Sequence, residues 1–468
     1  MTGKRKRKLA MPDTLIIVAS VVLLVAILSW IIPSGTYDYQ EMNINGRIRN
    51  VAIDGTYHTI DKSEVTTTGF LGFFSVLYWG CVKAADVIFM ILCCCGTFGV
   101  VVKTGAFHAG IGTILKKLKG KEILLVPIIM LIFGLGGSVF GMASEFYGFY
   151  PLIVGLGVAL GYDAMFGFAI IAVGEFVGFM GATLNPYSVG IAQTISGVEL
   201  YSGTGYRTIC FVIFMVISII YVMMYGRKIK KNPGASVVFG EKNIHAFDRD
   251  ELNEYSFTLK DGLVLLDVLV VLVVLMFGLI KWGWDFPQLC GLFLLMSMIA
   301  AAICKWSPNK WCSEFIDSAK TAMWGCILTG IAKAITVVMQ DAQIMDTVIY
   351  GLSNVLKNAP HAVSAQVMLV VQTLINFFIP SATGQASATM PIMAQLADII
   401  GVSRQTAVLA FQFGDGLSNI FWPTADIVII CGLGGISLQK WYKWFTPLFL
   451  ILFATQAILL GIATGIGF

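Results

Sequence analysis

The sequence predicts an all-α polytopic membrane protein built from two copies of one structural unit. Hydrophobic residues make up 57% of the 468 positions and charged residues only 12%, which excludes an ordinary water-soluble domain. Several apolar runs reach about 20 residues, the length that crosses roughly 30 Å of hydrocarbon. Two stretches of small, polar and helix-breaking residues interrupt these runs, and they recur at a constant spacing in the two halves of the chain.

The two interrupted stretches share one register. Pro151 and Pro391 are 240 positions apart (391 − 151), and the same offset relates three other pairs. Four matches in a single register indicate an internal repeat. The other pairs are Gly161 with Gly401, Glu145 with Gln385, and Gly174-Glu175 with Gly414-Asp415.

Residues 1–68 are expected to form a cytoplasmic basic tail, a first membrane span and an external loop. The basic run Lys4 to Lys8 places the N-terminus inside, because positive residues gather at cytoplasmic ends. The apolar run from Thr14 to Ile32 is too long for a signal peptide and has no cleavage site after it, so it should stay as a span. Residues 34–68 are polar and alternate around Asn45-Gly46, which predicts a small external hairpin.

Residues 69–226 are predicted to form a first transport repeat. Its aromatic-rich start either lies along the membrane interface or begins the next span, at 86–104. Residues 123–160 are apolar but broken by glycines, so we expect a re-entrant hairpin that enters and leaves on the cytoplasmic side. A helix that begins at Asp163 should break at Asn185-Pro186, because proline removes a backbone donor and disfavours helical geometry in the preceding residue.

The remainder of the chain predicts a linker, scaffold spans and a second copy of the repeat. Within that copy we expect a hairpin over 361–400 and a broken helix over 404–434. Basic residues at the loop ends give the two copies opposite orientations, and inverted repeats are the usual construction of secondary transporters. The predicted segments are a cytoplasmic linker at 227–258, two scaffold spans at 259–307, a second transport repeat at 308–445 and a last span at 446–468.

Polar side chains at the helix interruptions are the candidate binding residues. Discontinuous helices direct backbone amides at a substrate carboxylate, while freed carbonyls and short polar side chains suit a sodium ion, which we would expect near Asn185 and Ser381. The alternative is that small residues at these places only let helices approach closely. The substrate-binding candidates are Ser144, Glu145, Asn185, Ser188, Ser381, Thr383, Gln385, Asn419 and Thr424.

Three carboxylates at membrane depth, Glu175, Asp415 and Asp426, are candidates for ion coupling or for compensating substrate charge. Ionisable groups inside a membrane are costly, and a functional role is the default hypothesis for them. The competing interpretation is that Glu175 and Asp415 are buried charges paired with Lys333 or Arg404.

Other charged residues are expected to have structural roles. Lys83 and Lys103 lie near span ends and should extend their ammonium groups toward the interface. Asp163 and Asp398 lie at helix boundaries and should be solvated or cap helices.

The sequence predicts no cofactor and no resident metal. The ten cysteines and four histidines lack ligand spacing, and there is neither a phosphate-binding loop nor a nucleophile–base constellation. We therefore expect no enzyme activity and no nucleic-acid partner. The expected partners are the lipid bilayer, a small-molecule solute and a sodium ion or proton as coupling ion, and a homodimer is left open.

Several long motifs resemble one transporter family, the YfcC branch of the DcuC-type C4-dicarboxylate carriers in the ion-transporter superfamily. The resemblance covers nearly the whole chain and implies paired hairpins, broken helices and an elevator-type motion. Two features depart from the family: Ser-Asn-Thr hairpin tips are absent, and a single acid follows Ser144. The motifs are Gly141-Met-Ala-Ser-Glu145 with Phe149-Tyr-Pro151, Asn185-Pro-Tyr-Ser188 leading to Ala192-Gln193, Ser381 to Gln385 with Met390-Pro391, Ser403-Arg-Gln405 and Phe413-Gly-Asp-Gly416.

These observations predict a secondary active transporter in the cytoplasmic (inner) membrane that moves a small charged organic solute by alternating access. Names within the family imply either basic amino acids, in arginine/ornithine exchange, or C4-dicarboxylates. The excess of membrane acids over basic residues favours a cationic amino acid or cation coupling, and a C4-dicarboxylate carrier coupled to sodium or protons is the alternative. A channel or a membrane-embedded enzyme fits less well, because two broken helices around a closed midplane site suit alternating access.

Overall fold

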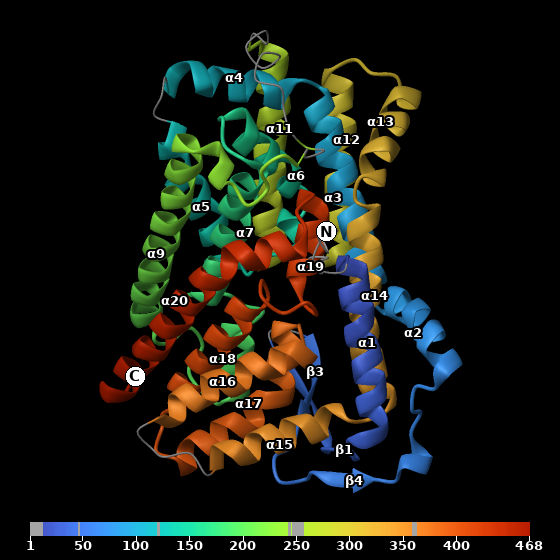
Figure 1. The fold of residues 1–468 in the computed structure, drawn as a ribbon, viewed down its shortest axis with the longest axis vertical. Helices are drawn as coiled ribbons and strands as arrows, with labels where there is room; N and C mark the ends of the chain where they lie inside the picture. The colour runs from blue at the N-terminus through green and yellow to red at the C-terminus, as the bar shows by residue number, and fades with distance from the viewer. Residues whose placement is uncertain (1–12, 45–46, 119–121, 242–244, 246–256, 358–362) are drawn as a thin grey trace, which may run out of the picture.

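The computed structural model of the chain describes every residue except 1–12, 45–46, 119–121, 242–244, 246–256 and 358–362. Three predictions fall outside the described residues: the basic tail, the Asn45-Gly46 turn and the central part of the linker. The part that is described consists mainly of helices, with four short strands near one end of the molecule (Figure 1).

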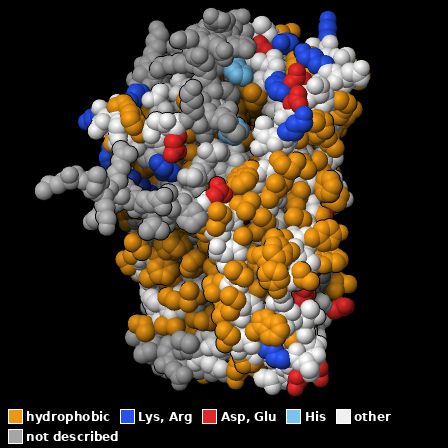
Figure 2. All heavy atoms as spheres, turned by 45° about the vertical axis from the view of Figure 1, so that its right-hand side comes forward, with side chains coloured by type: hydrophobic (Ala, Val, Ile, Leu, Met, Phe, Trp, Pro, Cys, Tyr) orange, Lys and Arg blue, Asp and Glu red, His pale blue; other side chains and the backbone are white. Residues whose placement is uncertain are grey.

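Seven of the described helices are long and apolar enough to cross a membrane. Their outward faces carry large apolar side chains, such as Ile31 and Leu266, which are 70% and 52% exposed. Figure 2 shows hydrophobic side chains over a broad central part of one face, with charged side chains gathered toward its ends. The chain is therefore a multi-pass membrane protein. The seven helices are α1 (Thr14–Ile31), α3 (Ala85–Lys103), α9 (Thr204–Lys231), α11 (Leu259–Lys281), α12 (Phe286–Ile303), α14 (Met323–Asp341) and α20 (Leu438–Gly465).

The order of the helices repeats in the two halves. In the first half, α2 (Phe70–Lys83) and α3 are followed by α4 (Ala106–Leu118), α5 (Leu125–Leu135), α6 (Phe149–Ala159), α7 (Ala164–Met180) and α8 (Val189–Ile195). In the second half, α13 (Pro308–Lys320) and α14 are followed by α15 (Met345–Lys357), α16 (Ser364–Phe378), α17 (Ala382–Ile399), α18 (Arg404–Ser418) and α19 (Asp426–Gly434). The ends of α6 and α17 are 240 residues apart (399 − 159), as are the starts of α7 and α18 (404 − 164).

Both predicted hairpins are interrupted helix pairs, and each packs on the broken helix of its own half. The pair α5–α6 contacts α7 in the upper part of Figure 1, and the pair α16–α17 contacts α18 in the lower part. Glycines make this packing close. An added Cβ at Gly174 would lie 3.0 Å from Met130 Cα, and one at the equivalent Gly414 would lie 2.9 Å from Thr373 N. Part of the small-residue pattern therefore serves helix packing, as the alternative interpretation expected.

The two broken helices also meet each other at the centre of the molecule. An added Cβ at Gly416 in α18 would lie 2.4 Å from Met180 Cα, at the end of α7. Further contacts join α8 to α17 and α19 to α6. Each half therefore supports the hairpin of the other.

The loop after α1 contains the expected hairpin and also a second pair of strands that was not expected, so the fold is not strictly all-α. Strand β2 (Tyr39–Ile44) pairs with β3 (Arg47–Ala52), and β1 (Ser34–Thr36) pairs with β4 (His58–Ile60), both antiparallel. The outer pair rests on α15, where Asp346 accepts hydrogen bonds from the hydroxyl of Thr36 (3.2 Å) and the backbone N–H of Tyr37 (3.0 Å), at the end of β1. Because Asp346 is far from these strands in sequence, no local sequence pattern predicts the contact.

Three helix boundaries differ from the predictions. Helix α7 ends at Met180, before Asn185-Pro186, since the backbone leaves helical geometry at Gly181. Helix α9 continues to Lys231, so the first residues of the predicted linker are helical. Helix α20 begins at Leu438, well before the predicted start of the last span.

Candidate functional site

The first hairpin turns at Gly141. A π-helical turn at Gly136–Phe140 ends there, with φ +69°, a backbone conformation that favours glycine. A Cβ at this position would lie 2.3 Å from Asn185 Oδ1. The tip of the first hairpin therefore rests directly on the unwound segment between α7 and α8.

Asn185 organises that unwound segment. Its Oδ1 accepts hydrogen bonds from the backbone N–H groups of Tyr187 (2.9 Å) and Ser188 (3.2 Å), and the side chain is completely buried. Its amide donates to Gly137 O at 3.5 Å. The hydroxyl of Ser188 is buried and has no hydrogen-bond partner among the described residues. Asn185 thus replaces hydrogen bonds that the broken helix lacks, and a sodium ion beside it stays a prediction.

The second hairpin is anchored to the first half. Ser381 is exposed, and its hydroxyl caps α17 by accepting from Gly384 N at 3.3 Å. Thr383 donates to the backbone oxygen of Tyr187 at 2.9 Å. The second hairpin therefore touches the unwound segment of the opposite half, so the two halves meet at both polar interruptions.

Asp415 lies in a cluster of buried amides. The Nδ2 group of Asn376 donates to Asp415 Oδ1 (2.9 Å), Gln385 Oε1 (3.2 Å) and Asn419 Oδ1 (3.2 Å). Asp415 Oδ2 and Asn376 Oδ1 are buried without a hydrogen-bond partner in the described part of the chain. Such an acceptor-rich cluster can stabilise a proton or a small cation, because it contains more acceptors than donors.

Glu175 has a simpler environment. The hydroxyl of Tyr150 donates to Glu175 Oε2 at 2.9 Å, and Oε1 is buried without a partner in the described residues. Arg404 pairs with Asp398 at 2.6 Å, and Lys333 lies in a separate cavity. The interpretation that Lys333 or Arg404 neutralises the buried carboxylates is therefore wrong.

A cavity of about 230 Å³ lies where the two halves meet. Hydroxyl groups and charges line it: Tyr147 donates to Asp426 Oδ1 at 2.6 Å, and the buried hydroxyl of Thr424 has no partner in the described structure. Lys333 of α14 also lines the cavity and makes no hydrogen bond or ion pair with any described residue. Lys83 borders the same cavity, although we expected it at the membrane interface.

The structure separates the predicted site residues into three groups. The central cavity collects only three of them: Ser144, Thr424 and Asp426. A second group forms hydrogen bonds in the protein interior or lies buried there: Glu145, Glu175, Asn185, Ser188, Thr383, Gln385, Asp415 and Asn419. Ser381 alone is an exposed helix cap.

Four contributors were missed by the sequence analysis: Tyr147, Tyr150, Asn376 and Lys333. Two of them had a usable signal, because Asn376 lies at the end of an apolar helix directly before the second motif and Tyr147 lies one turn beyond Ser144. Lys333 was predicted only as an ion-pair partner of Glu175 or Asp415.

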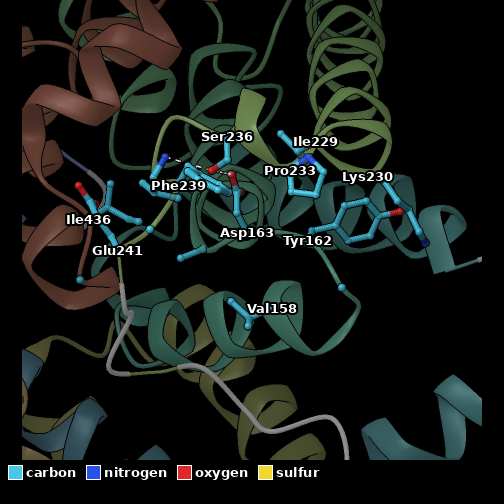
Figure 3. A pocket seen from close by; sticks show the side chains of 15 residues that line it. Val158, Tyr162, Asp163, Ile229, Lys230, Pro233, Ser236, Phe239, Glu241 and Ile436 are labelled. Carbon is cyan, nitrogen blue, oxygen red and sulfur yellow. Dashed lines mark hydrogen bonds between the residues drawn. The ribbon is translucent and has the colours of Figure 1, made fainter.

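A larger cavity of about 500 Å³ lies at the start of α7 and the end of α9, beside the linker (Figure 3). Its central acid is already fully engaged: Asp163 accepts from Tyr225 Oη (2.5 Å), Ser236 Oγ (2.6 Å) and Phe166 N (2.7 Å). The predicted capping role of Asp163 is confirmed. Because this acid holds the linker in place, the smaller central cavity is the better candidate site.

Comparison with known proteins gives a consistent result. The family model described as C4-dicarboxylate anaerobic carrier (DcuC) matches residues 11–465. The chain is 32% identical to a protein of Escherichia coli K12 named putative basic amino acid antiporter YfcC, covering 97% of each chain. It is 27% identical to an uncharacterized protein of Haemophilus influenzae, covering 98% of each.

Two solved transporter structures align along nearly the full chain. The YdaH transporter of Alcanivorax borkumensis aligns with a TM-score of 0.44 and 14% identity, covering 98% of this chain and 99% of its own. MtrF of Neisseria gonorrhoeae aligns with a TM-score of 0.44 and 15% identity, covering 97% and 96%. The family match and the YfcC relative confirm the resemblance seen in the motifs, and the chain belongs to the C4-dicarboxylate anaerobic carrier (DcuC) family of transporters.

Proposed function

We propose that this transporter is a secondary active carrier that exchanges small charged organic solutes across the cytoplasmic membrane, with a basic amino acid such as arginine or ornithine as the solute. One observation carries the proposal: a cavity lined by charges of both signs, Lys83, Lys333 and Asp426, lies between the two hairpins. The name of the YfcC relative supports the choice of solute.

An inverted-repeat architecture with an elevator-type motion is part of the proposal. The repeated order of helices supports it, as do the positions of the two hairpins in opposite parts of the molecule (Figure 1). Cysteines at Gly234, after α9, and at Gly351, in α15, should react with a membrane-impermeant thiol reagent from opposite sides of the membrane. Reaction from the same side would contradict the inverted arrangement. The inside N-terminus and the homodimer stay predictions.

Ion coupling is assigned to the two buried carboxylates. Asp415 and Glu175 each keep one oxygen without a hydrogen-bond partner among the described residues, and each has a neutral donor on the other. A proton or a sodium ion is the simplest complement for such an oxygen in a membrane interior.

Counterflow in proteoliposomes tests the transport class and the solute together. Vesicles are loaded with unlabelled arginine, ornithine, succinate or fumarate, and the labelled form of the same solute is added outside. The proposal expects a transient accumulation of label with arginine or ornithine, because a carrier couples outward to inward flux. A channel would equilibrate the label without overshoot, and no uptake of any solute would contradict a carrier for these compounds.

A C4-dicarboxylate coupled to sodium or protons is the second candidate. The description of the family favours it, and so do the two lysines, Lys83 and Lys333, that border the cavity. An overshoot with succinate or fumarate alone would select this candidate over the amino acid.

A further inference from the structure

We infer that the central cavity binds the head group of an α-amino acid, with the α-carboxylate on Lys333 and the α-ammonium on Asp426. This inference rests on the proposed transport of an amino acid and adds the two groups that recognise it. Lys333 belongs to α14, outside both hairpins and both broken helices, so the binding site would include a helix that the motifs do not reach.

Two opposite charges line the same cavity. Both residues line the space of about 230 Å³, and no ion pair joins them in the described structure. Each side chain is only half-buried, so each has access to the cavity. Separated opposite charges inside a membrane protein are costly unless something between them completes the pair. A zwitterion whose ammonium and carboxylate groups are attached to the same carbon is a natural complement.

Asp426 is held in a fixed position for this role. Tyr147 donates to its Oδ1 at 2.6 Å, which fixes the orientation of the carboxylate and leaves further acceptor sites for the cavity. Asp426 is the first residue of α19, where the positive end of the helix dipole favours a negative charge. An ammonium group can therefore approach a carboxylate whose orientation is fixed.

Lys333 supplies the complementary group. Its ammonium has three donors, and none of them is used by a described residue. The free hydroxyl of Thr424 and the side chain of Ser144 line the same cavity and can complete the hydrogen bonds of a bound carboxylate. Lys83, which also borders the cavity, is exposed, so the less exposed charged groups there, Lys333 and Asp426, suit one carboxylate and one ammonium.

The small volume of the cavity and the presence of Asp426 argue against two carboxylates. The volume is below the range of about 300–1,000 Å³ common for drug-sized ligands, so a small solute is favoured. A dicarboxylate held by Lys83 and Lys333 would place its charge beside Asp426, and like charges at close range repel each other. An α-amino acid avoids that contact.

Truncated ligands test the assignment group by group. Competition against labelled ornithine is measured for ornithine, for putrescine, which lacks the carboxylate, and for 5-aminovalerate, which lacks the α-amino group. Lys333→Met should weaken the binding of ornithine and of 5-aminovalerate about tenfold or more, which is the scale of a lost charge-assisted hydrogen bond. The binding of putrescine should be unchanged. Asp426→Asn should weaken the binding of ornithine and of putrescine and leave the binding of 5-aminovalerate unchanged.

Controls separate recognition from folding. Lys333→Arg keeps a cation and should retain most of the ornithine affinity, while Lys320→Met removes an exposed lysine outside the cavity and should change nothing. All variants are compared by size-exclusion profile.

Two results would overturn the inference, and they are distinguishable. If Lys333→Met weakens the binding of ornithine and the binding of putrescine equally, this lysine does not bind a carboxylate. The proposal that the protein transports an amino acid would then still stand. A wild-type protein that binds none of the three compounds would instead remove the amino acid from the proposed function, and the inference with it.

Discussion

The two halves of the molecule share one backbone plan but place different chemistry on it. Glu175 and Asp415 are equivalent positions in the 240-residue register, yet Glu175 is bonded by a tyrosine hydroxyl and Asp415 by an amide that also serves two other oxygens. The two halves also contribute different side chains to the central cavity. Its carboxylate is Asp426, and the equivalent position in the first half is Pro186.

This difference indicates that the backbone shared by the two halves forms the scaffold. The side chains that differ between the halves form the candidate site. The interrupted helices recur because each half needs a hairpin, a break and close glycine contacts. The charged groups of the cavity do not recur: the first half contributes Lys83 with the hydroxyls of Ser144 and Tyr147, and the second contributes Lys333, Thr424 and Asp426. Changes at repeated packing positions should therefore impair folding, and changes at divergent positions should impair transport.

The largest effect is expected at Gly178, where the first half is more tightly packed than the second. An added Cβ would lie 2.1 Å from Gly134 O and 2.5 Å from Gly134 Cα, which are backbone atoms of a hairpin arm. The equivalent position in the second half is Ser418, which already carries a side chain. Gly178→Val should cost more than the about 1–3 kcal/mol typical of overpacking and abolish the monodisperse peak after extraction. Gly291→Val in α12, where an added Cβ meets open space, is the control that should extract normally.

Next in size are the two buried carboxylates. Glu175→Gln and Asp415→Asn keep nearly the same shape, and no described lysine or arginine is left without its partner, so both variants should remain folded. Each should lower gradient-driven uptake about tenfold or more and change its dependence on sodium or pH. Asp415→Asn should have the stronger effect, because Asn376 links it to the second hairpin.

Stability and uptake measured on the same preparations check this prediction. Variants that melt normally and transport with unchanged ion dependence would remove both carboxylates from the coupling role.

A further comparison concerns the two helix interruptions. Asn185→Leu leaves two buried backbone N–H groups without an acceptor, at a cost of about 1–3 kcal/mol, and should abolish uptake. Ser381→Leu removes an exposed cap worth about 0.5–2 kcal/mol and should reduce uptake less. Asn185→Asp, which keeps the acceptor, is the matched control. Equal losses from both leucine variants would contradict the different roles that the structure gives these residues.

Much of the fold could be predicted because membrane helices leave local signals. Apolar runs located the spans, and glycines with Asn185-Pro186 located the interruptions to within a few residues. The β1–β4 pair was missed because it depends on Asp346, some 300 positions away in sequence.

The site was predicted only in part, because residue type and position do not determine which way a side chain points. The register correctly paired Glu175 with Asp415, but their partners, Tyr150 and Asn376, depend on how the hairpins pack. Lys333 is a single charge in an apolar helix, and the sequence could not show that it faces Asp426 across a cavity instead of pairing with Glu175.

The central claim is that the cavity between the halves holds the solute. Cysteine protection tests it directly, with Ser144→Cys in a protein whose ten native cysteines are replaced, and with Ser381→Cys as the control outside the cavity. Ornithine or succinate, tested separately at ten times its dissociation constant, should slow thiol modification at position 144 about tenfold by mass action and leave position 381 unchanged. Equal protection at both positions, or none at position 144 by a solute that is transported, would contradict the account.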